Sequence, residues 1–156
     1  YVALSYVWGA STSSRSGHCI QIGKYELRVT RNCEAALFTT LEEEGPIAIW
    51  VDSICIDQTS LSERNHQIQL MGCIYERAHT VFVWLSPDSP LLPVSMGYVK
   101  TLVGDGRLES SVAKRDILKH LLENEWFSRG WTYQEFVLAS NPVFLTHSAR
   151  LSWTEL

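Results

Sequence analysis

Three segments of this chain place tryptophan beside residues that can bind or act on a ligand. They are residues 4–9 (LSYVWG), 50–58 (WVDSICIDQ) and 126–135 (WFSRGWTYQE). Carboxylates, a guanidinium group and indole rings are groups with which proteins hold charged and aromatic ligands. Apolar packing has little use for such mixtures, because a polar group buried without a partner costs free energy. The three segments are therefore candidates for parts of one site.

The position of these polar groups indicates where such a site would lie. Two of the segments end apolar runs typical of buried strands, and ligands of doubly wound sheets bind outside the carboxyl ends of the strands. The third segment supplies a loop and a helix start that can face those ends. We expect the candidate site residues to converge there: Ser5, Trp8, Asp52, Gln58, Arg129, Trp131 and Glu135.

The rest of the chain predicts the elements that must position this site. Apolar runs predict strands at 1–6, 47–56, 80–85 and 142–146, and helical periodicity or helix-start signals predict helices at 30–44, 60–78, 94–103, 110–124 and 131–139. Residues 19–29 alternate around Gly23 and predict a small hairpin. This alternation predicts an α/β fold with a mainly parallel sheet flanked by helices and a β-hairpin insertion after the first strand. The run 47–56 has the pattern of a central parallel strand covered on both faces.

Composition limits the classes of partner. The 156 residues carry a formal charge of −4 and contain no basic run and no long apolar span, so we expect neither nucleic acid nor a membrane as partner. The four cysteines (Cys19, Cys33, Cys55 and Cys73) lack zinc-ligand spacing, so no metal is expected. Buried reduced thiols are the favoured interpretation, and they predict a cytoplasmic location. The abrupt ends suggest a single domain, residues 1–156, excised from a longer protein.

Several of the candidate site residues also have purely structural interpretations. Glu135 is equally well explained as an early-helix carboxylate or as the ion-pair partner of Arg129. Asp52 suits a turn cap that accepts backbone N–H groups. Ser5 lacks the sequence context of an activated nucleophile, and Cys55, expected inside a strand, suits a packed thiol better than a catalytic one.

The three segments, together with Glu63-Arg64, Gln67 and residues 83–85 (VWL), resemble the heterokaryon incompatibility (HET) domain of filamentous fungi. The resemblance covers nearly the whole chain. It implies a domain that triggers programmed cell death after non-self recognition, within a larger protein that carries a recognition module. It also implies activation by self-association.

The HET domain is in turn distantly similar to the TIR domain, which implies a flavodoxin-like, five-stranded fold. Some TIR domains cleave NAD+ with a single glutamate four positions after a tryptophan, and Trp131 and Glu135 have this spacing. The resemblance implies that Glu135 stabilises positive charge on the ribose of NAD+. Trp8 or Trp131 would stack on a base, and Arg129 would pair with the pyrophosphate. NAD+ would be substrate, and no cofactor is expected. The alternatives are a TIR-like self-association module without turnover and a nucleotide-binding sensor that does not cleave its ligand.

Overall fold

The computed structural model describes residues 1–9, 17–85, 89–105 and 112–153. Its central feature is a five-stranded sheet in the order β4 (Ile49–Val51), β1 (Val2–Tyr6), β5 (Thr80–Trp84), β6 (Pro142–Leu145) and β7 (Arg150–Ser152). The first four strands are parallel neighbours and β7 is antiparallel to β6. Numbered along the chain, this is the order 2-1-3-4-5 of flavodoxin-like folds. The predicted mainly parallel α/β fold is confirmed.

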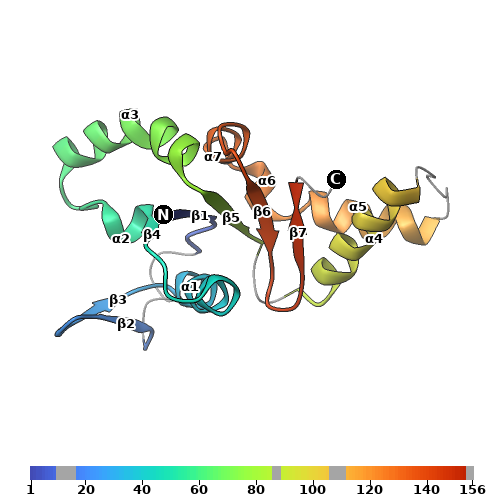
Figure 1. Ribbon diagram of the computed structural model, residues 1–156, viewed down its shortest axis with the longest axis horizontal. Helices are drawn as coiled ribbons and strands as arrows, with labels where there is room; N and C mark the ends of the chain where they lie inside the picture. Colours follow the sequence, from blue (N-terminus) through green and yellow to red (C-terminus); the bar gives the residue numbers. More distant parts are fainter. Residues whose placement is uncertain (10–16, 86–88, 106–111, 154–156) are drawn as a thin grey trace.

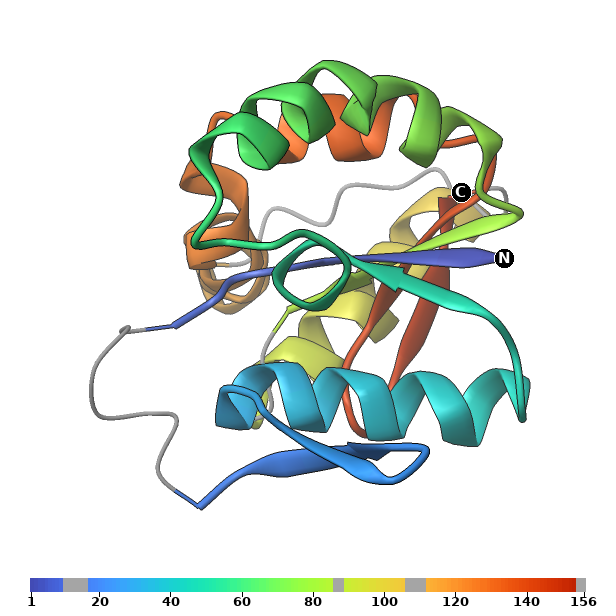
Figure 2. The same cartoon turned by 90° about the vertical axis from the view of Figure 1, so that its left-hand side faces the viewer.

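Helices cover both faces of this sheet (Figures 1 and 2). One face is covered by α1 (Arg31–Glu44), beyond which lies the hairpin of β2 (Cys19–Ile22) and β3 (Tyr25–Arg28), as predicted. The other face is covered by α3 (Leu61–Arg77) and the short α7 (Thr132–Val137). Three further helices pack around β5, β6 and β7: α4 (Leu91–Asp105), α5 (Val112–Leu122) and α6 (Glu125–Ser128). None of the helices in the described part of the chain is long and apolar enough to cross a membrane.

Strand alternation in β1 decides which residues face which helix. Val2, Leu4 and Tyr6 are buried in one core cluster with residues of α1, whereas Ala3 belongs to a second cluster with Met71 and Tyr75 of α3. Because side chains in a strand alternate between faces, Ser5 lies on the same side as Ala3. A buried polar residue is thereby directed toward α3 and α7.

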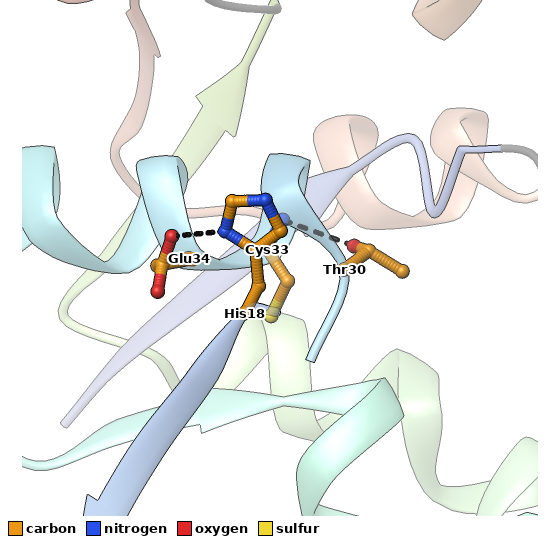
Figure 3. A network of polar contacts seen from close by, with 4 residues as sticks. All are labelled: His18, Thr30, Cys33 and Glu34. Atoms are coloured by element: carbon orange, nitrogen blue, oxygen red, sulfur yellow. Dashed lines mark hydrogen bonds and ion pairs between the residues drawn. The ribbon is translucent and has the colours of Figure 1, made fainter. Parts of the chain in front are cut away.

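The start of α1 is fixed by side chains that Figure 3 shows from close by. Thr30 caps the helix, and its Oγ1 accepts a hydrogen bond of 3.1 Å from the backbone N–H of Cys33. His18, which leads into the hairpin, lies 2.6 Å from the carboxylate of Glu34 in the first helical turn. The contact of His18 with Glu34 ties the start of the hairpin to the helix. At the start of α3 the side chain of Ser60 caps the helix, since its Oγ accepts from the N–H of Glu63 at 3.2 Å. The sequence Ser60–Glu63 is that of a capping box, but the reciprocal bond does not form, because the Glu63 carboxylate accepts from the N–H of Asp57 instead.

Two predictions about the second strand are wrong. The run 47–56 forms only the three-residue strand β4, which lies at the sheet edge, and then turns into the short helix α2 (Asp52–Cys55). Cys55 is consequently exposed rather than packed in a strand, and Cys19 and Cys73 are exposed as well. Only Cys33 is buried. Strand β7 was not predicted from the sequence.

We predict that Thr30→Ala lowers the free energy of unfolding by about 1 kcal/mol, because it removes the cap of a 14-residue helix whose first N–H groups need acceptors. Urea denaturation followed by circular dichroism would measure the change. Thr30→Ser keeps the hydroxyl and should lose much less, and equal losses in the two variants would contradict a capping role.

Candidate functional site

A pocket of about 270 Å³ opens outside the carboxyl ends of β1 and β4, bounded by α3 and by the segment that enters α7. This is where ligands of doubly wound sheets bind. Six of the seven residues singled out in the sequence line it: Trp8, Asp52, Gln58, Arg129, Trp131 and Glu135. The seventh, Ser5, lies behind the wall and bonds directly to Glu135. The predicted convergence is therefore observed, whereas the catalytic and binding roles of these residues stay predictions.

Glu135 is held by a chain of buried hydrogen bonds. Trp126 Nε1 donates to Ser5 Oγ at 2.7 Å, and Ser5 Oγ donates to Glu135 Oε2. Ser5 and Glu135 are only 1% and 3% exposed. Because an indole N–H can only donate, it engages a lone pair of the serine oxygen and leaves the hydroxyl hydrogen for the carboxylate. The chain fixes one carboxylate oxygen, and Oε1 accepts no hydrogen bond from the described residues.

Neighbouring groups offset part of the effect of burial on the ionisation of Glu135. The pKa of the Glu135 carboxyl lies above its usual value, chiefly because the group is buried. The hydrogen bond from Ser5 and the positive charge of Arg129 lower this pKa, whereas the negative charge of Asp52 raises it. Arg129 forms no ion pair with Glu135, because its Nη1 donates to the carbonyl oxygen of Tyr6 instead. The ion-pair interpretation of Glu135 is therefore wrong, and its place in the first turn of α7 is confirmed.

Asp52 organises the opposite wall of the pocket. Its Oδ2 accepts a hydrogen bond of 2.8 Å from Trp8 Nε1, and its Oδ1 accepts one of 2.7 Å from the N–H of Ser53. The amide of Gln58 donates to its backbone carbonyl at 2.9 Å. Burial raises the pKa of Asp52, and the bonds from Trp8 and Ser53 and the charge of Arg129 counter the rise. Asp52 accepts a backbone N–H as its structural interpretation predicted, and it also holds Trp8 and Gln58 at the pocket.

Four further pocket residues were not assigned to the site from the sequence: Ile56, Arg64, Ile68 and Met71. Ile68 is 42% exposed at the pocket. Arg64 makes no ion pair with the described residues. The Glu63-Arg64 motif, which contributes to the family resemblance, was the available signal for Arg64. Trp126 was noted only as a member of its dense segment, because a donor to Ser5 cannot be recognised before the fold is known.

The arrangement combines groups of distinct character around one cavity. Glu135 presents a carboxylate, Arg64 and Arg129 present positive charge, and Trp8 and Trp131 present ring faces or edges. Such a pocket suits a ligand that carries anionic groups and an aromatic ring. A buried carboxylate beside the ligand can stabilise positive charge that develops during bond breaking.

Comparison with known proteins identifies the family of this chain. The family model for the heterokaryon incompatibility protein (HET) matches residues 1–135, and the chain belongs to this family. It is 29% identical over 191 aligned positions to heterokaryon incompatibility protein 6, OR allele, of Neurospora crassa, covering 92% of this chain and 28% of that protein. It is 24% identical over 146 positions to vegetative incompatibility protein HET-E-1 of Podospora anserina, covering 94% of this chain and 10% of that protein. The chain thus spans under a third of either relative. No solved structure gives a significant match.

We predict that Ser5→Ala raises the pKa of Glu135 further, because it removes a hydrogen bond that favours the ionised carboxylate. Titration of the ¹³C-labelled carboxyl by NMR would report the change. Ser53→Ala removes a nearby hydroxyl that bonds Tyr6 rather than Glu135, and it should leave this pKa in place. An unchanged Glu135 pKa in Ser5→Ala would contradict the assigned hydrogen bond.

Proposed function

We propose that this domain is an effector of heterokaryon incompatibility that triggers cell death after non-self recognition by cleaving the nicotinamide–ribose bond of NAD+. The observation that carries the proposal is Glu135, a buried carboxyl group on the pocket wall whose Oε2 is held by Ser5 and whose Oε1 has no partner among the described residues. Membership of the HET family supports the biological role.

The reaction suits a site with one carboxylate. The bond between ribose C1′ and the pyridinium nitrogen breaks, and nicotinamide leaves as a neutral molecule with the bonding electron pair. The ribose develops oxocarbenium character, and water then adds to C1′ and releases a proton, giving ADP-ribose. Because the leaving group starts with positive charge, no general acid is required. Glu135 would stabilise the ribose cation electrostatically, as carboxylates do in glycoside hydrolysis.

The other pocket residues fit the remaining parts of the substrate. Trp8 and Trp131 offer faces or edges for a base, and Trp131 is 48% exposed. Arg129 is already engaged with Tyr6, so Arg64 is the arginine better able to meet the pyrophosphate. The spacing of Trp131 and Glu135 resembles that of NAD+-cleaving TIR domains and supports the same assignment.

A second candidate function is a self-association module without turnover. The observation that favours it is the outer surface of α7, where Tyr133, Val137 and Leu138 are 71%, 53% and 41% exposed. Exposed apolar groups so close together suit a contact with another protein. Self-association is also compatible with the enzyme, as the step that activates it. Because the relatives are much longer than this chain, a recognition module in the same protein or in a partner fits this scheme.

We predict that Glu135→Gln reduces NAD+ consumption at least a hundredfold, which is about the loss seen when one group that stabilises a transition-state charge is removed. The amide can still accept from Ser5, so the fold should persist. The assay measures nicotinamide release by the purified domain held as an oligomer through a fused oligomerisation tag.

Glu123→Gln is the matched control, because Glu123 is exposed just after α5 and, among the described residues, forms an ion pair with Lys119 alone. It should retain full activity. If the folded, oligomeric parent releases no nicotinamide, the self-association module becomes the better conclusion. If Glu135→Gln retains parental turnover, another group performs the chemistry.

We predict that Arg64→Ala raises the KM for NAD+ about tenfold or more and changes kcat little, because it removes a charge that binds substrate and transition state alike. Steady-state kinetics would separate the two parameters. Arg77→Ala removes a charge at the far end of α3 and serves as control. A fall in kcat with an unchanged KM would show that Arg64 acts in the chemical step instead.

A further inference from the structure

A second pocket of about 370 Å³ lies beside the first. It is bounded by the β2–β3 hairpin through Leu27 and Arg28, and by α2 through Ser53 and Ile54. Nothing in the function proposed above uses it. Like the first pocket, it opens at the carboxyl ends of β1 and β4, because Tyr6 and Gly9 of the β1 end also line it.

The two pockets share a wall. Trp8, Ile56 and Gln58 line both of them. Two of these residues are tied to one anchor, since Trp8 donates to the carboxylate of Asp52 and Gln58 donates to its backbone carbonyl. The indole ring of Trp8 therefore stands at the boundary in a fixed orientation. A ligand that passed from one pocket to the other would cross this ring.

Each pocket also has its own arginine. Arg64 lines the first pocket and Arg28 lines the second. Both side chains are exposed, and neither makes an ion pair with the part of the chain that the structure describes. One guanidinium group therefore lies on each side of Trp8. This arrangement suits a ligand with two linked anionic groups, one for each arginine, and a ring system attached to each of them.

We propose that the two pockets form one bipartite site for a dinucleotide, with the reacting half in the Glu135 pocket and the second nucleotide in the pocket between the hairpin and α2. This inference rests on the proposed function and names its substrate class. A dinucleotide has two bases, two riboses and two phosphates. The first pocket, at about 270 Å³, falls below the range of roughly 300–1,000 Å³ typical of sites for drug-sized ligands. It suits a mononucleotide, and the second pocket supplies the missing room.

The bipartite site gives the hairpin a role in selecting substrate. Leu27 and Arg28 lie on β3, which pairs with β2, and the residue before β2, His18, is held to Glu34 of α1 as Figure 3 shows. The hairpin thus forms one side of the second half-site. It would distinguish a dinucleotide from a mononucleotide while the reacting end makes the same contacts in both.

The test fills the second pocket and compares ligands that reach it with ligands that do not. Leu27→Trp adds bulk at a strand position where an aromatic residue is well tolerated. Binding of NAD+ and of nicotinamide mononucleotide is measured by isothermal calorimetry in the Glu135→Gln background, so that neither ligand is consumed. We expect Leu27→Trp to weaken NAD+ at least tenfold and nicotinamide mononucleotide by less than twofold.

Two further variants serve as a control and as an independent test. Tyr25→Trp adds the same ring to the same strand at a residue that is 68% exposed and lies outside the second pocket, and it should change neither affinity. Arg28→Glu reverses an exposed charge with little demand on folding, and it should again weaken NAD+ selectively.

The outcomes separate this inference from the proposed function. An unchanged NAD+ affinity in both Leu27→Trp and Arg28→Glu, an equal loss for both ligands, or no binding of NAD+ at all would overturn the bipartite site. The variants with changes in the second pocket could lose NAD+ affinity selectively while the parent domain, with Glu135 intact, never cleaves NAD+. This pair of results would support the bipartite site and overturn the proposed reaction.

Discussion

A buried carboxyl group needs a hydrogen-bond donor, and meeting this need at Glu135 joins distant parts of the chain. The donor is Ser5 of β1, and the indole of Trp126 in α6 fixes the direction of the Ser5 hydroxyl. Left unpaired, a buried charge would cost several kcal/mol or would be neutralised by protonation. The carboxylate can therefore exist only while β1, α6 and α7 keep their relative positions. The same geometry presents its second oxygen to the pocket.

Asp52 plays a comparable part on the opposite wall, but with a different result. All its described contacts fix other residues, namely Trp8, Ser53 and Gln58. The two acidic groups thus differ in their surroundings, since Glu135 presents one oxygen to the pocket and Asp52 holds residues of the pocket wall. Burial raises the pKa of both Asp52 and Glu135. Hydrogen bonds to each carboxylate and the positive charge of Arg129, which donates to the carbonyl oxygen of Tyr6, reduce this rise.

Much of this arrangement follows from local signals in the sequence. Periodicity and caps predict α1, α3, β1 and β5, and polar residues after strands predict the convergence of the site. The failures share one cause, because burial depends on neighbours that are distant in sequence. The apolar run 47–56 is compatible with a central strand, yet β4 pairs on one side only and the chain turns at Asp52. Likewise, Ile68 continues the apolar stripe of α3, but at this position along the helix the stripe faces the pocket instead of the packed core. The Trp126 link depends on a separation of 121 residues, which no local pattern reports.

The edges of the sheet bear on how copies of this domain can meet. Both edge strands, β4 and β7, are only three residues long. Short edge strands offer few free backbone N–H and C=O groups to a neighbouring chain and so discourage growth by strand addition. The self-association that the proposed function invokes is therefore expected to use side chains on helices rather than the backbone edges of this sheet.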